Sequence, residues 1–127
     1  MQFNNDKSIF LQIADSITDK VVSGMYPTGD KIPSVRELAA EMGVNPNTIM
    51  RTYNELQSMN IIDNKRGIGY FVSPDATKII LLQKKKAFFD KVLPEFIRQA
   101  GLLGITASDL RSHLDQLNNH NSSHENK

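Results

Sequence analysis

Hydrophobic and polar positions follow a helical spacing over much of the chain. From Ser8, apolar residues recur every fourth position until Gly24 provides a stop. A short periodic stretch then follows Ser34, and a longer one covers residues 46–59. Gly43 lies between these two stretches and permits the left-handed conformation that a tight turn needs. The pattern predicts three helices, the last two joined by a tight turn.

Capping signals mark the starts of the second and third helices. Ser34 and Glu37 fit a capping box, in which the serine hydroxyl accepts from the N3 amide and the carboxylate accepts from the N-cap amide. Asn45 fits the cap of the third helix, and Pro46 fits its first position, where a missing N–H costs nothing. We therefore expect the third helix to begin at Pro46.

Two short strands are predicted after the third helix, at Ile61–Asn64 and Tyr70–Val72. The residues between them, Lys65–Gly69, contain two glycines and read as a hairpin tip. Helix, turn, helix and hairpin in this order are typical of a winged helix-turn-helix. The expected fold is mainly α with a small β-wing, and we place this domain at residues 8–73.

A helical segment with two apolar stripes is predicted at about residues 76–100, with Pro94 kinking or splitting it, and Thr106 caps a last helix. Two stripes are more apolar surface than one small domain can cover, so residues 74–118 are expected to form two C-terminal helices at a dimer interface. The residues expected in that interface are Leu82, Phe88, Phe89, Val92, Leu93 and Phe96. The polar residues 119–127 are expected to be a disordered tail.

Composition narrows the possible functions. The chain has 127 residues, 39% of them hydrophobic and 23% charged, which is a soluble globular composition. The net charge is only +1, so affinity for nucleic acid has to come from local placement of Lys and Arg. The absence of cysteine excludes disulfides and thiol chemistry and favours the cytoplasm. The longest apolar run, Ile79–Leu82, is far too short to span a bilayer.

The outer side of the predicted third helix carries candidate DNA-binding residues. At about 100° per residue, Asn47, Thr48 and Arg51 fall opposite the apolar residues and near the N-terminal end. Such side chains bond base edges and phosphates, and a helix N-terminus favours a phosphate. At the hairpin tip, Lys65 and Arg66 stand beside glycines that allow close approach to a phosphate backbone.

Several segments match a known pattern in register over about residues 8–72: Leu11-Gln12-Ile13, Ser23-Gly24, Gly29 to Ala39, Val44 to Thr48, Tyr53 to Leu56 and Arg66 to Val72. They resemble the GntR family of bacterial transcription regulators. The short helical remainder resembles its YtrA subfamily, in which the C-terminal segment is too small for an effector domain and mainly builds the dimer. The resemblance implies a cytoplasmic homodimer that binds a palindromic double-stranded DNA operator, usually as a repressor.

The resemblance also implies which residues contact DNA. Arg36 matches the arginine of the family's P-S-x-R-E-L motif, and Gly69 is the nearest match to the glycine of the wing. Many members carry an arginine where this chain has Met50, and Arg51 is expected to serve instead. The complete expected set is Ser34, Arg36, Asn45, Pro46, Asn47, Thr48, Arg51, Lys65, Arg66, Gly67 and Gly69.

Two other functions stay open at this stage. The polar helix face could meet a protein rather than DNA, although an interface of that kind has no need for Arg36, Arg51 and the cationic tip together. A small apolar effector could lie among the C-terminal phenylalanines, although a dimer core is the simpler use. No enzyme motif or cofactor loop is present in the sequence, and the three histidines, His113, His120 and His124, lack the spacing of a metal site. We expect no enzymatic activity, no metal and no cofactor.

Overall fold

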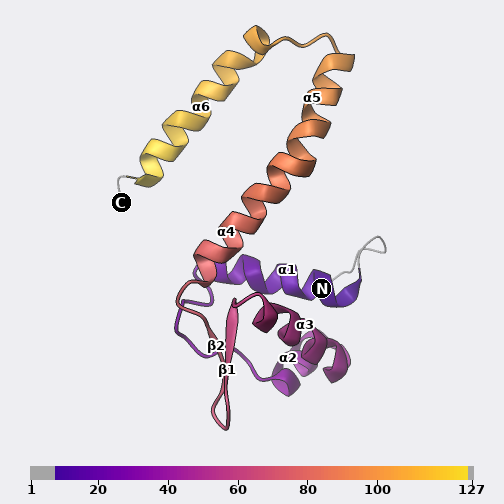
Figure 1. The fold of residues 1–127 in the computed structure, drawn as a ribbon, viewed down its shortest axis with the longest axis vertical. Coiled ribbons are helices and arrows are strands. Elements are labelled where there is room, and N and C mark those ends of the chain that lie inside the picture. The colour runs from indigo at the N-terminus through magenta and orange to yellow at the C-terminus, as the bar shows by residue number, and fades with distance from the viewer. Residues whose placement is uncertain (1–7, 126–127) are drawn as a thin grey trace. The chain divides into compact units, whose positions relative to one another are not determined.

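The structure is a computed structural model that describes residues 8–125, with side chains described for residues 8–120. It divides at residues 85 and 86 into two compact units, which we call the winged-helix unit and the C-terminal unit and describe separately. The winged-helix unit contains α1 (Ile9–Val22), α2 (Val35–Met42), α3 (Pro46–Ser58), β1 (Ile62–Lys65), β2 (Gly69–Val72) and most of α4 (Ala76–Ala87) (Figure 1). The predicted fold class, mainly α with a small β-wing, is confirmed.

The core of the winged-helix unit forms where α1 and α2 pack on α3. Each helix buries most of the stripe that its periodicity predicts, although Ile9 at the start of α1 is 47% exposed, and α3 also packs against β1. The side chains with no more than 1% of their surface exposed include Ile13, Ile17, Leu38, Ile49, Thr52, Tyr53, Leu56, Ile61 and Ile62. Burial of this single stripe on α3 leaves the opposite side of the helix free to face a partner.

The predicted caps of α2 and α3 are present. Ser34 accepts from the Glu37 N–H at 3.1 Å, and Glu37 in turn accepts from the Ser34 N–H at 3.0 Å, which completes the capping box. Gly43 ends α2 with φ of 70°, the left-handed conformation expected for the tight turn. Ser8 occupies the N-cap of α1, but its side chain makes no capping hydrogen bond.

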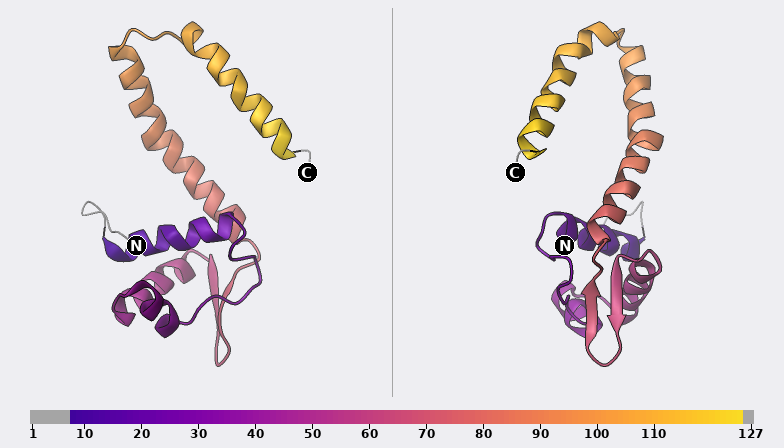
Figure 2. Two further views of the ribbon diagram at one scale, coloured as in Figure 1. Left: turned by 180° about the vertical axis from the view of Figure 1, so that it is seen from behind. Right: turned by 60° about the vertical axis from the view of Figure 1, so that its left-hand side comes forward.

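The hairpin pairs β1 with β2 in antiparallel register, with Ile62 opposite Val72 and Lys65 opposite Gly69. The segment before α2 runs along the other edge of β2. The Ile32 N–H donates to the Tyr70 carbonyl at 2.9 Å, and Lys31 forms an antiparallel β-bridge with Phe71. The tip of the hairpin extends past α2 and α3 (Figures 1 and 2). Strand β2 is therefore paired on both of its edges near the base of the hairpin, and the tip projects.

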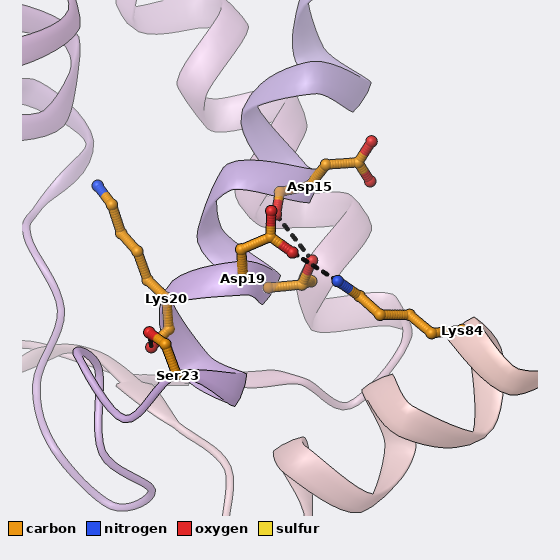
Figure 3. Close-up of polar contacts among 6 residues, drawn as sticks. Asp15, Asp19, Lys20, Ser23 and Lys84 are labelled. Carbon is orange, nitrogen blue, oxygen red and sulfur yellow. Dashed lines mark hydrogen bonds and ion pairs between the residues drawn. The ribbon is translucent and has the colours of Figure 1, made fainter. Parts of the chain in front are cut away.

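The first turns of α4 belong to the winged-helix unit rather than to a separate segment. Ala76 and Ile80 are at most 1% exposed and are part of the same core, so the unit extends beyond the predicted boundary at residue 73. On its surface, Lys84 of α4 pairs with Asp19 of α1 (Figure 3). Both side chains are largely exposed, so this ion pair adds about 1 kcal/mol at most. Burial of Ala76 and Ile80, rather than this ion pair, therefore holds the first turns of α4 on the core of the winged-helix unit.

The C-terminal unit contains the end of α4, the π-helical segment η1 (Phe88–Val92), α5 (Leu93–Leu102) and α6 (Ala107–Glu125). The predicted break near Pro94 is present as this π-helical segment. Proline has no N–H for the carbonyl four residues before it and clashes with that carbonyl, so a wider turn relieves both problems. The Leu93 N–H accordingly donates to the carbonyl of Phe88, five residues back.

The last helix is longer than predicted. Thr106 and Asp109 form a reciprocal pair of capping bonds, with the Asp109 N–H donating to the Thr106 hydroxyl at 3.2 Å and the Thr106 N–H to the Asp109 carboxylate at 2.9 Å. Helix α6 then continues to Glu125, so the prediction of a disordered tail over residues 119–127 is wrong for residues 119–125. A helix propagates more readily than it nucleates, which explains its extension through polar residues. Residues 126–127 lie outside the described part.

Candidate nucleic-acid interface

The outer face of α3 is exposed as the sequence predicts. Asn47 and Arg51 are exposed, and Thr48 is half-buried. Met50 is also exposed, with 42% of its surface accessible. This face combines amide, hydroxyl, guanidinium and thioether groups near the start of a helix, a set that suits both base edges and phosphates.

The start of α3 is built by residues that the sequence marks. The Asn45 side-chain oxygen accepts from the Asn47 N–H at 2.8 Å, and Pro46 occupies the first turn. The capping bond uses the carbonyl end of the Asn45 amide, so its NH₂ group is the end with hydrogens to donate. The helix dipole of α3 favours an anion in front of this turn.

Tyr53 joins α2 and the hairpin to α3. Its hydroxyl donates to the Pro33 carbonyl at 2.6 Å, directly before the cap of α2. Its ring meets the ring of Tyr70 in β2 edge-to-face, with centroids 4.8 Å apart. Burial raises the pKa of the Tyr53 hydroxyl well above its ordinary value, so it stays a donor at neutral pH. One buried side chain thus contacts both the start of α2 and the hairpin.

Arg51 is held by α1, which sequence reasoning missed. Its guanidinium carbon lies 4.0 Å from the ring centroid of Phe10, within cation–π range. Ser8, Ile9 and Phe10 of the first turn of α1 line a hollow of about 330 Å³ together with Asn47, Thr48 and Arg51. The structure therefore brings three predicted contact residues of α3 together beside the start of α1.

Met50 lies toward the hairpin. The Tyr70 hydroxyl of β2 is 4.0 Å from the Met50 sulfur, the length of a weak hydrogen bond to a thioether. The position where the resemblance leads one to expect arginine is thus occupied by an apolar side chain beside β2. Arg51 lies beside α1 instead, so the two residues are not interchangeable in placement.

The hairpin tip carries the predicted cations. Arg66 and Gly67 are exposed, and Gly67 has φ of 79°. Lys65 is exposed as well, and its amine lies 4.3 Å from the ring centroid of Phe71, which fixes it along the strand. The tip therefore presents positive charge on a backbone with little side-chain bulk.

Gly69 has a structural reason to be glycine, whatever it contacts. Its φ is 140°, and a Cβ placed on it would lie 2.7 Å from Cε of Lys31. Lys31 is thus a further exposed cation beside the hairpin, which sequence reasoning did not single out. The sequence alone does not show that Lys31 lies beside β2, because the two meet only when the segment before α2 pairs with that strand.

Ser34 and Arg36 lie at the start of α2. The Ser34 hydroxyl is engaged in the capping box, and the bonds from its backbone N–H and its side chain lower the pKa of Glu37 below the ordinary carboxyl value. Arg36 is exposed, and among the described side chains it has no ion-pair partner. The Arg36 charge is available to a partner, whereas Ser34 has a structural role.

Most of the residues predicted for a dimer interface are exposed. Leu82, Phe89 and Val92 have at least 55% of their surface accessible, Phe88 and Phe96 each have 46%, and Leu93 is half-buried. Within the C-terminal unit the prediction omitted further exposed apolar residues, namely Ile97, Leu102, Leu103, Ile105, Leu114 and Leu117. Among the described residues, no helix is long and apolar enough to cross a membrane, and no group of three His, Asp or Glu residues could hold a metal ion.

Comparison with known proteins identifies this arrangement. The family model for bacterial regulatory proteins of the gntR family matches residues 10–72. The uncharacterised HTH-type transcriptional regulator YhcF of Bacillus subtilis is 41% identical over 86% of this chain and 88% of its own length. The HTH-type transcriptional repressor YtrA of the same organism is 33% identical over 86% of this chain and 83% of its own length.

A solved structure agrees with these relatives. The crystal structure of a GntR-family protein from Bacteroides thetaiotaomicron superposes with a TM-score of 0.74 at 39% identity, covering 90% of this chain and 99% of that one. The agreement includes the short C-terminal part, since nearly the whole of both chains is covered. The expected resemblance is confirmed, and the chain belongs to the GntR family of bacterial regulatory proteins, among its short YtrA-like members.

Proposed function

We propose that the protein is a homodimeric transcription repressor that binds a palindromic operator with α3 and the hairpin of each protomer. The observation that carries the proposal is the outer face of α3, where Asn47, Thr48 and Arg51 stand together at a capped helix start. The name of the relative YtrA supports the sign of regulation, because that protein is a transcriptional repressor.

The geometry suits readout from the major groove. Helix α3 has 13 residues and is exposed on one side, and the major groove admits a helix of this width. Arginine and asparagine at the start of such a helix are the side chains that make bidentate contacts to guanine and adenine. Lys65 and Arg66 at the projecting tip would then meet the flanking backbone, where they add affinity but little base preference.

Dimerisation is supported by the apolar side chains beyond the core. Leu82, Phe88, Phe89, Val92 and Phe96 expose large apolar surfaces, which soluble monomers seldom leave uncovered in such number. A two-fold pair of identical chains would cover them and present two copies of α3 to half-sites about one helical turn apart. This arrangement explains how a chain of net charge +1 could bind DNA well, because two sets of local cations act together.

Selection from random duplexes tests the proposal directly. The purified full chain is incubated with a library of random double-stranded DNA, and bound duplexes are amplified and sequenced over several rounds. We expect an inverted repeat with half-sites about 10 base pairs apart, centre to centre. Enrichment of no sequence, with equal affinity for all duplexes, would refute specific DNA binding and favour the protein-interaction module.

The chain acts in the cytoplasm, where its DNA target lies, and it performs no reaction of its own. The exposed Arg36, Arg51, Lys65 and Arg66 argue against the protein-interaction alternative, because cations on α2, α3 and the hairpin suit phosphates and base edges.

A further inference from the structure

We propose that Phe10 is a positioning residue for DNA recognition, which holds the Arg51 guanidinium in place before DNA arrives. The inference rests on the proposed function and adds a residue of α1 to the machinery of α3. It starts from one contact, in which the Arg51 guanidinium carbon lies 4.0 Å from the centroid of the Phe10 ring.

Phe10 is itself fixed to α3 by a second contact. The buried Thr52 hydroxyl is 3.1 Å from the Phe10 carbonyl and 2.9 Å from the Thr48 carbonyl, and these two acceptors share its single hydrogen. Thr52 directly follows Arg51 in α3. The backbone of residue 10 is therefore anchored to the turn of α3 that carries Arg51, whose guanidinium lies over the Phe10 ring.

The stacking leaves the arginine able to read DNA. A guanidinium that rests on an aromatic ring uses its face, whereas its five N–H donors point outward in its own plane. Those donors stay beside Asn47 and Thr48, which line the same hollow. Phe10 has no hydroxyl and cannot donate to a phosphate, so its contribution passes through Arg51.

The energetic consequence is preorganisation. A free arginine loses side-chain entropy when it binds, and a contact that orders it beforehand removes part of that cost from the binding step. A cation–π contact of this kind corresponds to a change of about 2- to 30-fold in an equilibrium constant, depending on how far the pair is desolvated. Loss of the ring should therefore weaken operator binding within that range.

A double-mutant cycle tests the inference with the full-length protein and the selected operator. The variants are Phe10→Leu, Phe10→Tyr, Arg51→Ala and Phe10→Leu with Arg51→Ala, measured on the operator and on a scrambled duplex of the same composition. We expect Phe10→Leu to weaken operator binding by about 2- to 30-fold and to leave scrambled-duplex binding unchanged. Phe10→Tyr retains the ring and should bind the operator with the wild-type affinity.

The Arg51→Ala background gives the decisive comparison. If Phe10 acts through Arg51, the Phe10→Leu change has no further effect there. An equal loss in both backgrounds, an equal loss on both duplexes, or a failure of Phe10→Tyr to restore binding would each overturn the inference. Wild-type operator affinity in Arg51→Ala would overturn it too, while leaving the proposed function intact. A wild-type protein that does not discriminate the duplexes would instead refute the proposed function, and the inference with it.

Discussion

Tyr53 shows how a single residue supports the reading surface without touching it. Its buried ring and hydroxyl connect α3 to Pro33, directly before α2, and to Tyr70 in β2. The helical spacing of Ile49, Tyr53 and Leu56 favours burial of Tyr53 in the core. The partners of its hydroxyl and ring lie 20 and 17 positions away along the chain, so the sequence alone did not reveal them.

Tyr53→Phe removes the hydroxyl and keeps the ring. We expect the free energy of unfolding to fall by about 1 kcal/mol at pH 7, the usual net contribution of one hydrogen bond. Because burial raises the Tyr53 pKa above its ordinary value of 10.0, the folded state favours the neutral phenol. The stability that the neutral Tyr53 hydroxyl confers is present below pH 10.0 and is lost as pH rises above that value.

Urea unfolding at several pH values measures both effects. The difference between wild type and Tyr53→Phe should be largest near neutral pH and should shrink above pH 10.0. Operator binding should weaken slightly as the start of α2 and the hairpin loosen. A variant as stable as wild type at pH 7 would show that the bond to Pro33 contributes nothing.

Among the expected contact residues, those on α3 were predictable and those of the hairpin only partly so. Helical periodicity alone places Asn47, Thr48 and Arg51 on the outer face. The positions of Phe10 and Lys31 beside that surface depend on tertiary packing between segments distant in sequence. No local pattern carries that information.

At the scale of elements, the capped helix starts were predicted most accurately. Capping depends on a few neighbouring residues, so Ser34 with Glu37 and Asn45 with Pro46 mark α2 and α3 to the residue. The end of α6 was predicted less well because no stop signal precedes its polar residues. Pro94 indicated a break, but not its π-helical form, which depends on how the backbone relieves the clash.

The capping box of α2 makes a pH-dependent contribution to stability. Bonds from the Ser34 backbone and hydroxyl lower the pKa of Glu37, so the folded state favours the carboxylate. The stabilisation is therefore present above the ordinary value of 4.5 and is lost as pH falls through the lower folded-state pKa. Glu37→Gln keeps an acceptor at this position but cannot titrate.

We expect wild type to be more stable than Glu37→Gln at pH 7, and the two stabilities to converge as the pH drops below 4.5. Denaturant unfolding at pH values from 7 down to about 3 would measure this difference, because that range brackets the ordinary pKa of a carboxyl group. A difference that stays constant over that range would show that the carboxylate has no special role in the cap.

At the scale of the whole molecule, function is proposed to need two copies of the chain. Phe89 is 62% exposed and lies among the apolar residues assigned to the interface. Phe89→Asp would place a charge in that interface, where desolvation makes it costly. We expect a monomer at micromolar concentration and a loss of at least about 100-fold in affinity for a duplex with two half-sites.

Light scattering and duplex titration measure these effects, with Met25→Asp as the matched control. Met25 is 67% exposed but is not among the residues assigned to the interface, so its replacement by Asp should leave a dimer with normal affinity. A wild-type protein that is monomeric at these concentrations, or a Phe89→Asp variant that remains dimeric, would contradict the assigned interface.

The central claim is that the outer face of α3 reads base sequence, and the discrimination ratio tests it most directly. Fluorescence anisotropy gives the Kd for a scrambled duplex divided by the Kd for the selected operator, at one salt concentration. For wild type we predict a ratio of about 1,000 or more. For Arg51→Ala we predict a ratio lower by about 5- to 150-fold, as expected for loss of a base contact. A wild-type ratio near 1, or equal weakening of both duplexes by Arg51→Ala, would contradict the claim.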